Sequence, residues 1–164
     1  MVSNDKLAEQ LALLLTKSHL KLAIAESCTG GGLAYQLTEI PGSSLWFERG
    51  FITYSNLSKQ EMLGVSPQTL ESHGAVSAET AKEMAEGILK QSIADISLSI
   101  TGIAGPTGGT IDKPIGTVWF GLARRGSGAE VRLVQFVPTN RKQIRYDAIG
   151  FALNWLIEKV SHTS

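Results

Sequence analysis

The sequence predicts an α/β fold, a three-layer α/β/α sandwich around a mixed, mostly parallel sheet of about five strands. Segments with helically spaced apolar residues alternate with short apolar strands up to residue 100. A hairpin pattern and a final helical segment follow. The 164 residues, 43% of them hydrophobic, suffice for one sizeable core, whereas two domains would each be undersized. We therefore expect a single domain over residues 1–164.

The first helix and strand are followed by a glycine-rich turn. Ser3 or Asn4 caps a helix whose leucines share one face, at Leu7, Leu11, Leu14 and Leu15. Residues 20–26, LKLAIAE, form a short apolar strand. The next helix is expected to begin near Thr29, in the sequence TGGG. Glycine costs about 1 kcal/mol against alanine inside a helix, but at a helix start it allows close approach to exposed N–H groups.

A strand and two short helices are predicted between residues 45 and 74. The strand covers residues 45–54, and the first helix covers residues 56–63. Ser66 caps the second helix, Pro67 takes its first position and Gly74 ends it.

The second half of the chain is predicted to add two helices and three strands. Ser77 caps a helix that turns Ala81, Met84, Ala85 and Ile88 toward the core. It leads into a strand over residues 94–100, and residues 116–123 and 130–137 form a hairpin around the turn RRGSG. Thr139 is expected to cap the last helix, whose buried stripe is Ile144, Ala148, Phe151 and Trp155.

The charge balance and the histidine and cysteine pattern exclude several classes of function. Fifteen basic residues balance fifteen acidic ones, so no global field favours nucleic acid or a membrane as a partner. The start, MVSNDKLAEQ, lacks the blocks of a signal peptide, and no apolar run approaches the roughly 20 residues of a membrane helix, so we expect a cytoplasmic protein. The single cysteine and the three scattered histidines show no metal-ligand spacing, so we expect neither metal nor cofactor.

Polar residues collect where the predicted parallel strands end. Ser27, Tyr54 and Thr101 lie at three such ends, which meet at the rim where open α/β sheets bind ligands. Lys59, one turn into a short helix, could reach back over Ser27 and act as its base once burial lowers the pKa of the lysine. Tyr54 could hold or relay the proton. With no histidine near any of them, the set favours a serine and lysine mechanism.

Each of these residues also has a simpler interpretation. Ser27 and Thr29 could be cap residues, Lys59 a solvated lysine, and Tyr54 the exposed end of a strand. Cys28 is a rival nucleophile, because a thiol at a helix start can have a depressed pKa. It ranks lower, since no base lies beside it in the sequence and a lone cysteine is more often a small buried residue.

Two further segments could contact a small ligand. The loop over residues 101–114, which includes Gly102, allows close backbone approach. It lacks the ending of a P-loop and precedes a strand, so a nucleoside triphosphate site is disfavoured. Arg141 and Arg145 share a helix face and suit one phosphate or carboxylate, although such arginines are usually solvated.

Five motifs lie in order along the chain: AESCTGG, GSSLWFERGFITYSNLSKQEMLGV, HGAVS, SITGIAGPTGG and KPIGTVWFGL. Together they resemble the nicotinamide-nucleotide amidohydrolase family, also known as the C-terminal domain of the competence/damage-inducible protein CinA. The resemblance covers about residues 7–155. It implies hydrolysis of nicotinamide mononucleotide to nicotinic acid mononucleotide and ammonia, a step of pyridine nucleotide salvage. Longer members carry an N-terminal pyrophosphatase domain, for which this chain has no room.

The functional positions implied by the resemblance are Ser27, Thr29, Ser44, Tyr54, Lys59 and Thr101. Ser44 precedes its strand, and about eight extended residues, roughly 26 Å, would separate it from the rim. Either Ser27 is the nucleophile and Ser44 is structural, or Ser44 acts in a site completed by a neighbouring subunit.

Geometry favours Ser27 as the nucleophile. In that interpretation, the helix start at Thr29 and Gly30 holds the oxyanion, and Arg145 takes the phosphate of the nucleotide substrate. A homo-oligomer is expected, with a dimer favoured. One alternative is a non-catalytic nucleotide-binding or partner-binding module, and the least favoured is a DNA adaptor, because the sequence has no basic stripe.

Overall fold

One mixed sheet runs through the computed structural model, which describes residues 1–163, in the strand order β2-β1-β3-β4-β5. β1 pairs in parallel with β2 and β3, and the β4–β5 hairpin continues the sheet antiparallel from β3. The strands are β1 (Leu22–Glu26), β2 (Phe47–Ile52), β3 (Ile96–Gly102), β4 (Thr117–Arg124) and β5 (Ala129–Gln135). The mixed five-stranded sheet confirms the predicted fold class.

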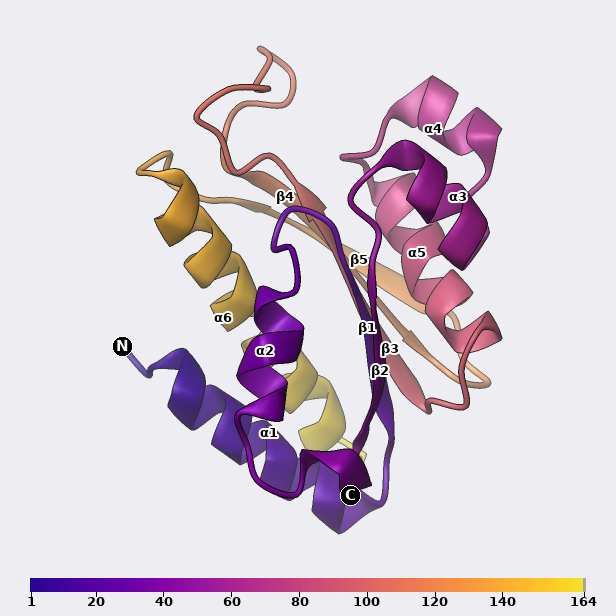
Figure 1. Cartoon of the computed structure of the whole chain (residues 1–164), viewed down its shortest axis with the longest axis vertical. Helices are drawn as coiled ribbons and strands as arrows, with labels where there is room; N and C mark the ends of the chain where they lie inside the picture. The colour runs from indigo at the N-terminus through magenta and orange to yellow at the C-terminus, as the bar shows by residue number, and fades with distance from the viewer. Residues whose placement is uncertain (164) are drawn as a thin grey trace.

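Helices cover both faces of the sheet (Figure 1). One face carries α1 (Asn4–Ser18), α2 (Gly32–Thr38) and α6 (Arg141–Ser161), and the other carries α3 (Asn56–Leu63), α4 (Pro67–His73) and α5 (Ala78–Lys90). A 3-10 turn, η1 (Ser43–Leu45), leads into β2. Each face has its own buried apolar cluster, so the core is divided by the sheet. Within residues 1–163, no helix combines the length and apolarity needed to span a membrane.

Among the element boundaries that differ from the sequence-based expectation, two have an identifiable local cause. The last helix is capped by Asn140, whose Oδ1 accepts the Gln143 N–H at 2.9 Å, so the prediction of Thr139 as the cap is wrong. Asn140 has the extended backbone of a cap, and its side chain reaches the N–H of the third helical residue. Thr139 lies one residue too far from that N–H to cap the helix. β2 begins at Phe47, later than predicted, because η1 takes up the residues before it.

Glycine allows α5 to approach β4 closely. A Cβ on Gly121 would lie 2.3 Å from the Ala81 carbonyl oxygen of α5, so no larger residue fits there. The neighbouring strand β3 is tied to the same helix, since Ser99 Oγ donates to Ala81 O at 2.7 Å and Ser97 Oγ donates to Ala85 O at 2.7 Å. These contacts fix β3, whose carboxyl end carries Thr101, against the helical layer.

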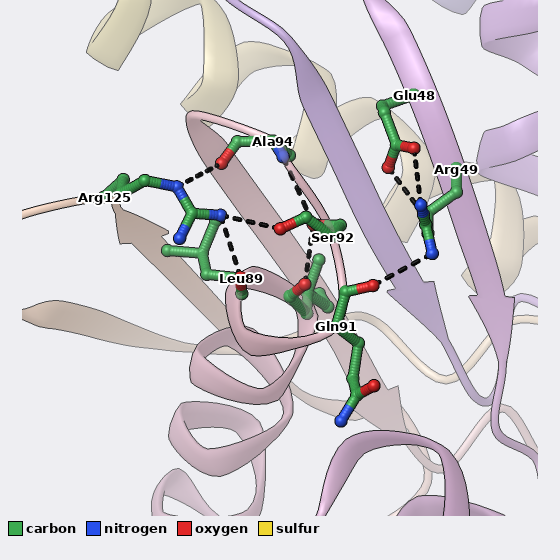
Figure 2. A network of polar contacts seen from close by, with 8 residues as sticks. Glu48, Arg49, Leu89, Gln91, Ser92, Ala94 and Arg125 are labelled. Atoms are coloured by element: carbon green, nitrogen blue, oxygen red, sulfur yellow. Dashed lines mark hydrogen bonds and ion pairs between the residues drawn. The ribbon is translucent and has the colours of Figure 1, made fainter.

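Two arginines donate to backbone carbonyls at the C-terminal end of α5 and in the turn that follows it (Figure 2). Arg125 Nη2 donates to the carbonyls of Leu89 at 2.8 Å and Ser92 at 2.9 Å. Arg49, which also pairs with Glu48, donates through Nη1 to the Gln91 carbonyl at 2.9 Å. The last carbonyls of a helix lack intrahelical donors, and Arg125 satisfies one of them at Leu89 in α5. The bonds to Gln91 and Ser92 anchor the turn that follows the helix.

Candidate active site

A cavity of about 260 Å³ opens where β1, β2 and β3 end. The predicted site residues among its lining are Ser27, Tyr54, Lys59, Thr101 and Gly102. The parallel register of the three strands places their carboxyl ends at one rim, which is why residues so distant in sequence meet here. A larger cavity of about 630 Å³ lies between the β4–β5 hairpin and the end of α6, and none of the predicted site residues lines it.

Ser27 and Lys59 are in direct contact. Lys59 Nζ lies 3.0 Å from Ser27 Oγ, and Lys59 is 1% exposed. A capping box between Ser55 and Ser58 starts α3 and sets Lys59 in its first turn, facing back toward the end of β1. The proximity expected from the sequence is therefore present in a single chain.

The lysine amine has neutral partners. Nζ also donates to the Thr53 carbonyl at 2.8 Å and lies 3.5 Å from the Tyr54 carbonyl. Carbonyl oxygens only accept hydrogen bonds, so the N–H groups turn toward them and the remaining tetrahedral position of Nζ faces Ser27 Oγ. Within residues 1–163, no carboxylate forms an ion pair with Lys59, and none lines the cavity.

Burial changes the pKa of both ionisable groups next to Ser27. Desolvation lowers the pKa of Lys59 from its ordinary value, which favours the neutral amine that a general base requires. Burial of Cys28 outweighs the opposing hydrogen bond from its own backbone and raises the pKa of the thiol to about 12. Cys28 is therefore a protonated thiol at neutral pH and a poor nucleophile.

The helix after β1 begins at Gly32, later than predicted, and its start is already occupied. The fully buried carboxylate of Glu26 accepts the N–H groups of Leu33 at 2.8 Å and Ala34 at 3.0 Å. The protein supplies its own anion at the start of α2, so the N–H groups of Leu33 and Ala34 are not available to an oxyanion.

The two residues assigned to the oxyanion lie in the turn before α2. The Gly30 N–H donates to the Ser27 carbonyl at 3.0 Å and is therefore engaged. The Thr29 N–H has no acceptor in the described part of the chain, and the same is true of its buried Oγ1. Of this pair, Thr29 keeps an available backbone donor.

The structure brings Arg141 to the cavity, and it places Arg145 elsewhere. Arg145 Nη2 donates to the Thr29 carbonyl at 3.0 Å, and its side chain is absent from the cavity lining. Arg141 lines the cavity and donates from Nη1 to the Gly105 carbonyl at 2.8 Å and from Nη2 to the Tyr54 hydroxyl at 2.9 Å. Arg145, which the sequence analysis assigned to the phosphate, therefore lies outside the cavity lining in this structure.

Tyr54 and Thr101 lie at the cavity with their hydroxyl groups already engaged. The Tyr54 hydroxyl accepts from Arg141, and the Tyr54 backbone carbonyl lies 3.5 Å from Lys59 Nζ. Thr101 Oγ1 donates to the Ala75 carbonyl at 2.8 Å and joins β3 to the loop before α5. Both residues shape the cavity walls beside the Ser27 and Lys59 pair.

Ser44 does not reach the cavity within one chain. It is exposed in η1, which precedes β2, and the N–H of Leu22 at the start of β1 donates to the carbonyl of Trp46 just after η1. Ser44 therefore lies at the edge of the sheet opposite the carboxyl ends of β1 and β2, as the sequence predicted.

Sequence reasoning missed three contributors. Glu26 carried a usable signal, since a charged residue ends an otherwise apolar strand, directly before Ser27. The carbonyls of Thr53 and Gly105 carried none, because the orientation of a backbone group depends on the folded chain. Within residues 1–163, no group of three or more histidine, cysteine, aspartate or glutamate side chains could hold a metal ion.

Comparisons with known proteins identify the family of this chain. The family model described as the CinA C-terminal domain matches residues 4–160. The nicotinamide-nucleotide amidohydrolase PncC of Enterobacter agglomerans is 51% identical over 79% of this chain and 78% of its own. The protein of the same name from Escherichia coli (strain K12) is 48% identical over 92% and 91%. The crystal structure of the competence damage-inducible protein A from Klebsiella pneumoniae superposes with a TM-score of 0.94, at 35% identity, over 99% of this chain and 100% of that one. The chain therefore belongs to the CinA C-terminal domain family.

Proposed function

We propose that this protein is a nicotinamide-nucleotide amidohydrolase that converts nicotinamide mononucleotide to nicotinic acid mononucleotide and ammonia. Two relatives with that enzyme name share about half of their aligned residues with this chain. The observation that carries the proposal is the 3.0 Å contact between Ser27 Oγ and a buried lysine amine that has no acidic partner in residues 1–163. Binding alone does not require such a proton-transfer pair.

The proposed reaction proceeds through an acyl-enzyme. Ser27 Oγ attacks the carboxamide carbon while its proton moves to neutral Lys59 Nζ. Lys59 then returns that proton to the departing nitrogen, so ammonia leaves and an ester to Ser27 remains. Water attacks this ester with Lys59 again as base, which releases the carboxylic acid and restores Ser27. The free N–H of Thr29 is our candidate donor to the oxyanion.

Ser44 belongs to this proposal only through a second copy of the chain. We propose a single-domain cytoplasmic enzyme that acts as a homodimer, without nucleic acid or membrane partners. In that assembly, Ser44 of one copy could approach the cavity of the other. Within one chain, its place at the opposite edge of the sheet leaves Ser27 as the nucleophile.

Ammonia release from nicotinamide mononucleotide tests the proposal. We expect turnover by the wild type, loss of at least about 1,000-fold in Ser27→Ala, and near wild-type rates in Ser43→Ala, a control serine in η1. Ser44→Ala, compared with that control, tells whether Ser44 contributes. A folded wild type that binds the nucleotide without releasing ammonia would overturn the enzymatic function and leave a binding module in its place.

A further inference from the structure

Besides Ser27 and Lys59, the cavity has a second polar region in the loop between β3 and β4. Ala104, Gly105, Thr107 and Gly108 line it, and their N–H groups have no acceptor within residues 1–163. Ala104 and Gly105 are buried, and a buried backbone donor is almost always paired in a native protein. These unpaired donors at the cavity wall are therefore available to a ligand that brings its own acceptor oxygens.

The backbone of this loop has the form that binds anions. Gly105 has a φ of 75° and Gly108 a φ of 93°, both in the region that favours glycine. Glycines of this kind allow a short turn to present several backbone N–H groups to one concavity, an arrangement found in phosphate sites. In Figure 1, the loop before β4 projects beyond the carboxyl edge of the sheet, above the strand ends that carry the cavity.

The charge of the cavity also favours an anion. Arg141 carries a permanent positive charge, and among residues 1–163 no aspartate or glutamate lines the cavity. The Gly105 carbonyl and the Tyr54 hydroxyl accept from the two terminal nitrogens of Arg141, which fixes the guanidinium at the loop. An arginine held in this way is pre-organised for the oxygens of a phosphate and has further N–H donors to offer.

We propose that Arg141 and the backbone N–H groups of Ala104, Gly105, Thr107 and Gly108 bind the 5′-phosphate of the substrate, so that the enzyme selects mononucleotides over nucleosides. This subsite rests on the proposed amidohydrolase function, and it assigns the opposite ends of one cavity to the two ends of the substrate. The carboxamide lies at Ser27 and Lys59, and the phosphate lies at Arg141. Arg145, which donates to the Thr29 carbonyl, has no part in phosphate recognition.

The first test compares nicotinamide mononucleotide with nicotinamide riboside, which lacks the phosphate. We expect Arg141→Gln to lower kcat/KM for the mononucleotide on the order of 10- to 100-fold, the effect of losing a charged hydrogen-bond donor, and to lower it much less for the riboside. Lys142→Gln removes the neighbouring exposed charge, which is outside the cavity lining, and should leave both values unchanged. An unchanged preference in Arg141→Gln, or a collapsed preference in Arg145→Gln, would overturn the subsite.

Binding of inorganic phosphate separates this inference from the proposed function. The wild type should bind phosphate in calorimetric titration, phosphate should compete with the mononucleotide, and Arg141→Gln should lose both effects. Tyr54→Phe keeps the arginine charge but removes its hydroxyl partner, so it should weaken phosphate binding only a few-fold. If the wild type releases no ammonia but shows this pattern, the function fails and the anion subsite stands. If phosphate binds equally to wild type and Arg141→Gln, or to neither, the subsite is refuted.

Discussion

Replacing Lys59 by methionine removes the proposed base while keeping a long side chain in the same buried space. The Lys59 amine lies 3.0 Å from Ser27 Oγ. Among residues 1–163, no other titratable amine or imidazole lines the cavity. Methionine fills a similar volume and carries no charge, so the apolar packing around the side chain is largely retained.

The expected loss of activity follows from that contact. A positioned general base contributes about 100- to 10,000-fold, and here the same amine also delivers the proton to ammonia. We therefore expect Lys59→Met to lower kcat by at least about 1,000-fold. Because the serine and the lysine act as one unit, Ser27→Ala in addition should lower kcat little further. Lys59→Arg, which keeps the charge but cannot deprotonate, should be equally inactive.

The pH dependence of the wild type has a defined sign. Burial lowers the pKa of Lys59 below its ordinary value of 10.5, and the neutral amine is the active form, so kcat/KM should rise with pH and level off below 10.5. Between the folded-state pKa and 10.5, the unfolded chain binds a proton that the folded chain does not. In that window the free energy of unfolding should increase by about 1.4 kcal/mol for each unit by which the pH rises, and it should decrease correspondingly as the pH falls.

Lys59→Met provides the matched comparison for stability. It lacks this titration, so the stability of the wild type relative to the variant should fall as the pH decreases through the same window. At lower pH the variant avoids a buried cation but leaves the Thr53 carbonyl without its donor, which costs about 1–3 kcal/mol. Denaturant unfolding at several pH values and ammonia release measure the two effects. A folded Lys59→Met variant with a tenth or more of wild-type kcat would refute the role of Lys59 as the base.

Three further changes test other parts of the structure. Cys28→Ala should keep most of the ammonia-releasing activity, because the thiol is protonated at neutral pH with a pKa of about 12; a loss comparable to that of Ser27→Ala would reinstate the thiol as nucleophile. Glu26→Gln should destabilise the protein by about 1–3 kcal/mol in denaturant unfolding, since one of the two N–H groups at the start of α2 then faces an amide nitrogen; unchanged stability would contradict that cap. Gly121→Ala should cost more than about 2 kcal/mol, because the new Cβ would lie 2.3 Å from Ala81 O, and a variant as stable as the wild type would show that α5 can shift away from β4.

The layers of this fold could be predicted because its elements have strong local signals. The stripe of α5 and the apolar run of β3 each identify an element, and the antiparallel hairpin follows from its short turn. Element ends were less certain, because they depend on which nearby group accepts a hydrogen bond. Asn140 rather than Thr139 caps α6 for this reason, and η1 takes residues that sequence propensity assigned to β2.

The candidate site could be predicted as far as strand topology determines it. Ser27, Tyr54 and Thr101 follow or end strands whose carboxyl ends meet, so their shared rim required only the correct sheet. Arg141 and Arg145 could not be distinguished, because both lie near the start of one helix and a rotation of that helix decides which one faces the cavity. The hydrogen bonds of the Glu26 carboxylate to the start of α2 could not be predicted either, since they depend on the side-chain conformation of Glu26.

The uncharged hydrogen-bond partners of Lys59 indicate its role more clearly than the burial of its side chain does. A buried cation kept for stability is expected beside a carboxylate, because an unpaired charge in the interior is costly. Within residues 1–163, Lys59 has two backbone carbonyls and one hydroxyl as its partners. A neutral amine is satisfied by this set, with N–H groups toward the carbonyls and the lone pair toward Ser27 Oγ. The same surroundings that lower the pKa of the lysine therefore also direct its basic lone pair at the nucleophile, and both conditions are needed for a serine to attack an amide without a histidine.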